Sequence, residues 1–163
     1  MELTTVDILI RLVVAVLLGG LVGVERTLAG KTAGMRTYAL VSMGSALFAV
    51  VSLLMGEKLI GTLGYNPVAL GPAIISGIGF IGAGLVFHNS QDMRTSGLTS
   101  AAGLWVAAGV GMACGFGFAL IAVIAALLTL LIFTVMWYVE KAFKKISYSD
   151  EKEEIENSER LHE

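Results

Sequence analysis

The sequence predicts an all-α fold: a polytopic transmembrane bundle of five helices held together by close, glycine-mediated packing. Of its 163 residues, 56% are hydrophobic and only 15% are charged, whereas a soluble domain carries about a quarter charged residues. The charges are gathered between long uncharged blocks. One such block, residues 68–87, is rich in glycine, and about 20 apolar residues can cross the roughly 30 Å hydrocarbon core of a bilayer.

The first two predicted helices cover residues 7–24 and 35–55, two apolar blocks bounded by charged residues. Glu2 and Asp7 precede or open the first block, whereas a secretory signal begins with basic residues. We therefore expect this helix to be retained. Asp7 and Arg11 are four residues apart, so we expect them to pair while Arg11 extends outward toward the headgroups.

The third predicted helix covers residues 68–87. The uncharged block that follows, residues 98–139, is too long for one crossing, because a single helix of that length reaches roughly 60 Å. Gly115-Phe116-Gly117 is the natural break, since glycine tolerates turn geometry. We therefore predict a fourth helix at residues 98–114 and a fifth, peripheral and lipid-facing, at residues 118–139. The alternative is a four-helix bundle with a re-entrant segment.

Lysine and arginine predict the orientation, because they concentrate on the cytoplasmic side of membrane proteins. With five helices, one side holds most of them: Arg26, Lys31, Arg36, Arg94, Lys141, Lys144 and Lys145. The other side holds Lys58 and possibly Arg11. An even number of crossings would separate the first group. We therefore expect the N-terminus outside and the C-terminus in the cytoplasm.

The last residues differ from the rest. Residues 1–140 are predicted to form the membrane domain and residues 141–163 a charged cytoplasmic tail, because the end of the chain is acidic, polar and poor in aromatic residues. The tail is expected to be a short charged helix or disordered. Trp137, Tyr138 and the lysines after them are typical of an anchor at the membrane surface.

Small residues at helical spacing predict where the helices touch. They are Gly19, Gly23, Gly77, Gly79, Gly82, Gly84, Gly103, Ala107, Gly111 and Gly115. Such residues let helix backbones approach closely. The contact they make is either a seam within one chain or the interface of a homo-oligomer.

A polar cluster is predicted on the membrane face that carries the cations. Its members are Glu25, Arg26, Arg36, Thr37, Asp92 and Arg94. Glu25 is expected to form a charge-assisted pair with Arg26 or with Arg36. These residues are either ordinary boundary charges or a cytoplasmic site for a regulator, a partner protein or an anion.

Several classes of function are excluded at this stage. A single cysteine, Cys114, permits no intrachain disulfide, and with only His88 and His162 it cannot build a zinc site. We expect no metal and no cofactor. The net charge of −2 argues against nucleic-acid binding. No metalloprotease, P-loop or nucleophile-elbow motif is present, so we expect no enzymatic activity and no catalytic residues.

Four motifs in order resemble the membrane domain of the MgtC/SapB family. They are GGLVGVER (residues 19–26), KTAGMRTYALVSMGSALF (31–48), ISGIGFIGAGLV (75–86) and SGLTSAAGLWVAAGVGMACG (96–115). The resemblance covers roughly residues 8–118. It implies a bacterial inner-membrane protein linked to adaptation to low magnesium, acid tolerance and, in pathogens, survival in macrophages.

The resemblance also assigns residues. The acid–base pair after the family's first helix falls on Glu25 and Arg26, and its arginine–threonine pair on Arg36 and Thr37. The family's usual Asp-Pro-x-Arg element is replaced here by Asn-Pro-Val-Ala at residues 66–69, so no role that needs its aspartate is expected. Longer members carry a soluble C-terminal domain resembling a small ligand-binding module, for which this chain is expected to have no room.

Two functions follow as expectations. Family members are often labelled magnesium transporters, yet the resemblance implies regulation through other membrane proteins, including the proton-driven ATP synthase and phosphate uptake. Magnesium prefers oxygen ligands, typically carboxylates, and the only acids in the predicted spans, Asp7 and Glu25, are at helix ends. Carbonyls of a glycine-broken helix could still coordinate a cation. We expect a regulator that binds other membrane proteins, with cation transport as the alternative.

Overall fold

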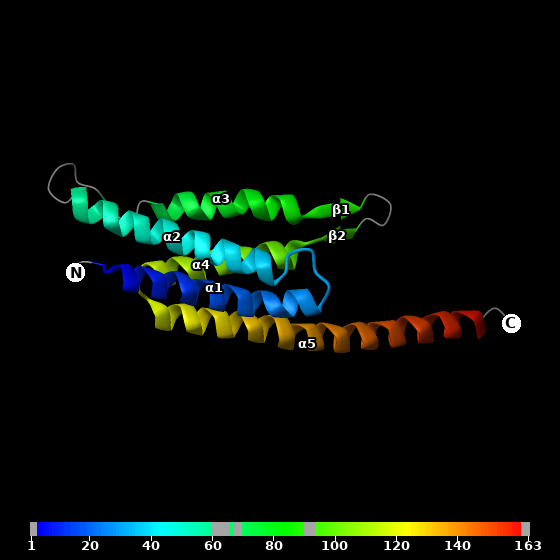
Figure 1. The fold of residues 1–163 in the computed structure, drawn as a ribbon. Helices are drawn as coiled ribbons and strands as arrows, with labels where there is room; N and C mark the ends of the chain where they lie inside the picture. Colours follow the sequence, from blue (N-terminus) through cyan, green and yellow to red (C-terminus); the bar gives the residue numbers. More distant parts are fainter. Residues whose placement is uncertain (1–2, 60–65, 67–69, 90–93, 161–163) are drawn as a thin grey trace. The chain divides into compact units, whose positions relative to one another are not determined.

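The computed structural model describes the backbone of residues 3–59, 66, 70–89 and 94–160, and side chains within residues 3–59, 66, 70–86 and 96–143. Five α-helices and one two-stranded hairpin lie in this part of the chain (Figure 1). The chain divides into two units. Residues 1–129 hold α1 to α4 and the start of α5, and residues 130–163 hold the rest of α5.

Helix α1 spans Thr5–Leu28 and is longer than predicted at both ends. Thr4 caps it: the Thr4 hydroxyl accepts a hydrogen bond from the Asp7 backbone, and the Asp7 carboxylate accepts one from the Thr4 backbone. This reciprocal capping box satisfies backbone donors at the helix start. That Arg11 extends outward toward the headgroups stays a prediction. Its guanidinium reaches across the bundle and donates to the Gly115 carbonyl oxygen at 2.6 Å, where a cation stabilises the C-terminus of a helix.

Helix α2 spans Met35–Leu59 and starts at the predicted residue. Helix α3 spans Leu70–Leu85, and its 16 residues measure about 24 Å. The first two residues of the predicted helix, 68 and 69, lie outside the described residues. Beyond α3 the chain becomes extended. Strand β1 (Phe87–Asn89) pairs antiparallel with strand β2 (Arg94–Ser96). The hydrophobicity of residues 86 and 87 therefore belongs to the approach to a strand, and the helix predicted there is wrong.

A tight junction joins the hairpin to helix α4. Gly97 follows β2 with φ +90°, and a Cβ there would collide with the Leu85 carbonyl oxygen. Only glycine allows both the left-handed backbone and this approach to the end of α3. Helix α4 then spans Leu98–Gly115, within one residue of the prediction.

The predicted break at residues 115–117 is confirmed: Gly117 has φ +89° in the turn after α4. Helix α5 spans Ala119–Arg160, far beyond the predicted end at residue 139. Neither glycine nor proline occurs in this stretch, so nothing in the backbone chemistry stops the helix. The charged tail is thus helical to Arg160. Outside the bundle unit, Lys141 Nζ lies 5.2 Å from the centre of the Trp137 ring, a cation–π contact that suits an interfacial anchor.

The core of the bundle unit is made where α1, α2 and α4 pack together, with α3 against α4. Most of the buried side chains are small, and Tyr38 and Leu104 are the largest that are fully buried among the described residues. The first turns of α5 behave as predicted: Ala122 and Ala126 are buried, whereas the large apolar side chains around them are exposed, namely Val123, Ile124, Leu127 and Leu128.

The predicted packing glycines fall into two groups, of which the first lies at the contacts of α2. A Cβ on Gly19 would lie 2.5 Å from Ser42 Cβ, and one on Gly23 would lie 2.6 Å from Met35 Cα. Gly111 and Gly115 of α4 are held as closely against α2. The buried residues of α4 also include Gly103 and Ala107.

The second group, the glycines of α3, is packed less tightly than the first. A Cβ on Gly82 would make ordinary contact with Ala101 at 3.6 Å. Gly77, Gly79 and Gly84 meet nothing within 4 Å in the described part of the chain. Within the described residues no neighbouring helix approaches these three glycines closely, so a seam within the chain is not seen at them. A contact with a second copy stays a prediction for these three.

The helices are long and apolar enough for a multi-pass membrane protein. Among the described residues, four helical segments meet that condition: α1, α2, α4 and Ala119–Phe143 of α5. Helix α3 is apolar but shorter. It runs antiparallel to α2 and returns the chain to the end that holds the α1–α2 loop (Figure 1). Five helices are what the sequence predicted.

The close contact of α4 with α2 predicts a sharp difference between two glycines. A Cβ at Gly111 would collide with the Ser42 carbonyl oxygen, whereas one at Gly109 meets nothing within 4 Å among described residues. We expect Gly111→Ala to lower the free energy of unfolding by about 1–3 kcal/mol through overpacking. Gly109→Ala should change it by less than about 0.5 kcal/mol. SDS titration in mixed micelles measures both, and equal values would contradict this packing.

Candidate functional site

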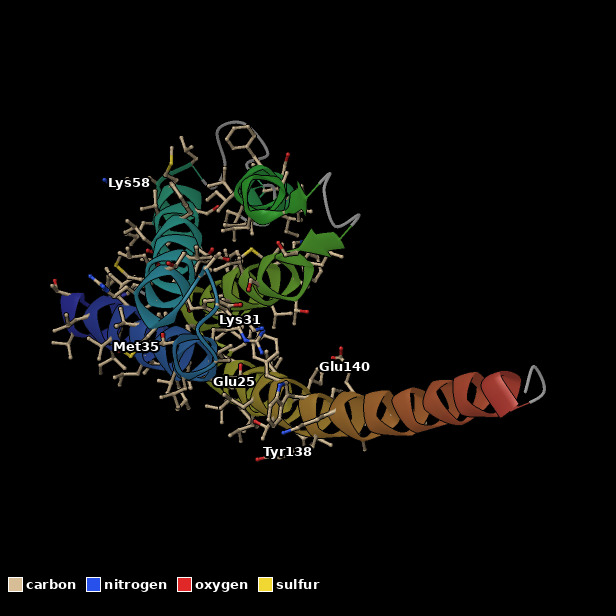
Figure 2. The ribbon with its side chains drawn as sticks, turned by 90° about the vertical axis from the view of Figure 1, so that its right-hand side faces the viewer. Glu25, Lys31, Met35, Lys58, Tyr138 and Glu140 are labelled. Atoms are coloured by element: carbon tan, nitrogen blue, oxygen red, sulfur yellow. The ribbon has the colours of Figure 1, made fainter. Side chains whose placement is uncertain are left out.

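The polar residues gather at the end of the bundle where α1 ends and α2 and α4 begin. We call the set Glu25, Arg26, Lys31, Arg36 and Thr37 the charged rim. Figure 2 looks onto this end, with Glu25, Lys31 and Met35 labelled. The antiparallel order of the helices brings these segments together, as the five-helix topology predicted.

Glu25 pairs with Arg26, one of the two partners that the sequence left open. Arg26 Nε donates to Glu25 Oε2 at 2.5 Å, and the side chains of Arg26 and Glu25 are 5% and 22% exposed. Arg26 lies on the face of α1 that also buries Gly19, Val22 and Gly23, so its direction follows from helical spacing. A buried guanidinium needs a compensating charge. Glu25 supplies one and therefore belongs to the structure as well as to the surface.

Tyr38 links this pair to α4, and the sequence prediction missed it. It lies one turn into α2, is fully buried, and its hydroxyl donates to the Ser100 carbonyl oxygen of α4 at 3.1 Å. Glu25 and Arg26 are both close enough to act electrostatically on the tyrosine. The sequence feature that could have predicted this role is the position of Tyr38, one helical turn after the cations that open the second apolar block. A tyrosine ring can be buried there, but its hydroxyl still needs a hydrogen-bond partner.

Thr27 shapes the loop that carries the exposed cations, and it too was missed. Its hydroxyl donates to the Gly23 carbonyl oxygen at 3.1 Å and accepts from the Met35 backbone at 2.8 Å. The last turn of α1 thereby caps the first turn of α2, satisfying a donor that the helix cannot satisfy itself. A Cβ at Gly34 would collide with this hydroxyl at 2.5 Å. The loop is consequently held close to α1.

The remaining predicted residues separate by exposure. Arg36 is exposed and Thr37 half-buried, and Lys31 in the loop is also exposed. Asp92 lies outside the described residues, and Arg94 is described only as backbone in β2. The structure thus brings Glu25 and Arg26 together, and Lys31 and Arg36 are accessible cations at the same end of the bundle. Their meeting with Asp92 and Arg94 stays a prediction.

This arrangement can bind an anionic group or a partner's acidic surface without rearranging the core. The guanidinium of Arg36 presents several hydrogen-bond donors to solvent. Arg36 lies in the first turn of α2, which the hydrogen bond from the Met35 backbone to Thr27 holds in place. Among the described residues, no three His, Cys, Asp or Glu side chains group as a metal site would require. The chemistry on offer at the rim is electrostatic recognition.

The pairing predicts selective energetic coupling. In a double-mutant cycle of Glu25→Gln with Arg26→Gln, we expect a coupling free energy of about 0.5–3 kcal/mol, because the two groups touch. The matched cycle of Glu25→Gln with Arg36→Gln should give less than about 0.5 kcal/mol. Unfolding free energies in mixed micelles supply both values. If Glu25 were coupled to Arg36 as strongly as to Arg26, the Glu25–Arg26 ion pair would be contradicted.

The chain is similar in sequence to several known proteins. The chain matches the MgtC family over residues 12–142. It is 39% identical over 100 residues to a protein of Escherichia coli K12 named "Putative magnesium transporter YhiD", covering 60% of this chain and 46% of that protein. It is 43% identical over 89 residues to Protein MgtC of Brucella abortus strain 2308, covering 54% of this chain and 34% of that protein.

A third relative is Protein SapB of Bacillus subtilis strain 168, 39% identical over 98 residues, which cover 59% of this chain and 42% of that protein. The matched region is about half or less of the length of each of these relatives. No solved structure matches the chain. The family match spans more than half of the chain, and the chain is therefore a multi-pass membrane protein of the MgtC family.

Proposed function

We propose that this protein acts in the bacterial inner membrane in adaptation to low magnesium and in ion homeostasis, by regulating other membrane proteins. In this proposal it is not an enzyme. Its N-terminus is outside, and the charged rim and the C-terminus face the cytoplasm. The rim then recognises a partner membrane protein, and a homo-oligomer is compatible with the exposed apolar helix faces.

The observation that supports regulation best is the closed contact among α1, α2 and α4. At Gly19, Gly23 and Gly111 the neighbouring atoms leave no room for one added carbon. Magnesium gives up its water shell reluctantly and usually keeps several waters. A hydrated cation therefore has no passage between these three helices as they stand.

The charged rim also supports a regulatory function. Arg36 and Lys31 are exposed above the buried Glu25–Arg26 pair, and the Thr27 cap fixes the loop between them. A cationic surface on a fixed scaffold is suited to electrostatic recognition, which steers partners and sets specificity. Such a surface at the level of the headgroups is accessible to another membrane protein.

Cation transport is the second candidate, and one feature favours it besides the name of the E. coli relative. Helix α2 buries hydroxyl groups in the bundle, at Ser42, Ser45 and Ser52. Ser42 Oγ has no hydrogen-bond partner among the described residues. Buried polar atoms are normally paired, and polar groups inside a membrane often mark a pathway.

The regulatory proposal predicts that growth at low magnesium depends on the charged rim, although the protein itself transports no magnesium. In cells lacking a family member, the wild-type chain should restore growth at low magnesium, whereas Arg36→Gln should not, although its unfolding free energy is unchanged. Lys58→Gln, at the other end of α2 (Figure 2), is the matched control and should restore growth. Liposomes holding only the purified wild-type protein should take up no more magnesium than empty ones, at low and high magnesium. Saturable uptake would reject the proposal in favour of transport.

Ser42 gives a direct test between the two candidates. If its hydroxyl is only a small group at a helix crossing, Ser42→Ala removes an unpaired buried donor, and the protein should be as stable as wild type or more so. Growth at low magnesium should then be unchanged. Ser45→Ala serves as a comparison on the same helix. Stable Ser42→Ala protein that no longer supports growth would favour a pathway through the hydroxyl-bearing face of α2.

A further inference from the structure

A groove of about 550 Å³ opens between α2 and α3. One wall comes from the first half of α2 and includes Leu40, Gly44 and Phe48; the other comes from α3 and includes Ile74, Gly77 and Ile81. All of these except the glycines are apolar side chains. The groove is therefore an apolar slot at the depth of the hydrocarbon core.

Glycine hollows both walls of this groove. A Cβ at Gly44 or at Gly77 would meet nothing within 4 Å among the described residues. This is the opposite of Gly111, where no atom can be added. Since the two helices contact each other only sparsely, the space is not needed for their packing. It is available to an occupant from outside the bundle.

The charge at one end of the groove indicates what the occupant is. Residues four apart lie on one face of a helix, so Arg36 lies one turn before Leu40, the first α2 residue that lines the groove. Arg36 is exposed. Thr37 stands in the same way one turn before Val41, which also lines the groove. An apolar slot that ends at an exposed guanidinium complements a molecule with an apolar tail and an anionic head.

We propose that the α2–α3 groove binds one acyl chain of an anionic phospholipid, with the lipid phosphate at Arg36. The groove follows α2 from Leu40 to Phe48 with a volume of about 550 Å³, which one flexible acyl chain can occupy. In a bilayer the tail gains close packing contacts rather than burial from water. Headgroup charge supplies the selectivity, because a cation near the surface attracts anionic lipid. This inference does not depend on the proposed function.

Native mass spectrometry of the full-length protein in mild detergent tests the proposal. The probes are dioleoyl phosphatidylglycerol and dioleoyl phosphatidylethanolamine, which share their tails. We expect one bound phosphatidylglycerol, preferred about fivefold over phosphatidylethanolamine, the effect of roughly one cation at a membrane surface. Arg36→Gln should abolish the preference, and Lys58→Gln should keep it. A preference that survives Arg36→Gln would overturn the assignment of the phosphate to this residue.

Two glycines of α3 provide the matched test of the tail. Gly77→Leu fills the groove and should reduce the binding of both lipids about fivefold or more. Gly79→Leu, on the same helix and equally open but outside the groove, should bind as wild type. Equal binding by the two variants would overturn the proposal in favour of unselective lipid around the protein. A dimer that only Gly77→Leu abolishes would overturn it in favour of a second copy in the groove.

A measurement on the unaltered chain guards against variants that fail to fold. A phosphatidylglycerol with a diazirine in its acyl chain, activated by light, should label Phe48 and Ile81 in the groove. Phe80, the neighbour of Ile81, is 85% exposed and does not line the groove. Labelling of Phe80 at the level of Ile81 or above would overturn the proposal.

Discussion

Contact between the backbones of α1, α2 and α4 is the constraint on which the structure depends. Lipid tails are as apolar as leucine, so helices in a membrane gain little from burying apolar surface against each other. What holds them is dense van der Waals contact, which requires small side chains at the crossing. Gly19, Gly23 and Gly111 meet that need, with atoms of α2 in the positions that their side chains would occupy.

The same crossing arranges the polar chemistry at one end. Because Gly23 brings α1 against the first turn of α2, Tyr38 is enclosed and reaches α4 with its hydroxyl. Arg26 lies one turn after Val22 on the buried face of α1, where its charge must be neutralised, and Glu25 does this. The exposed cations therefore stand on a base that is buried and paired. Recognition at the rim need not disturb the packing beneath it.

Hydropathy and glycine spacing were enough to predict the five helices, the α4 boundaries and the break at 115–117. The charges named Arg26 as one of two possible partners for Glu25. Prediction failed where tertiary contact decides. Hydropathy cannot distinguish the end of α3 from a strand, so the β hairpin was missed. The hydrogen-bond partner of Arg11, the carbonyl of Gly115 at the end of α4, lies 104 residues away in the chain and was not predicted. Spacing alone also cannot say whether a glycine faces a neighbour, as Gly111 does, or open space, as Gly77 does.

Glycine thus has two opposite uses in this bundle. Together they indicate where a lipid or a partner protein could bind. At Gly111 it removes space and closes the centre; at Gly44 and Gly77 it creates space on the flank. The closed centre leaves no room for a partner or a lipid among the described residues, so both proposed contacts lie elsewhere, on the flank and at the rim. Arg36 is the residue that stands beside both. An occupant of the groove would share that guanidinium with a partner at the rim, and binding of one would then alter the affinity for the other by the same factor in each direction.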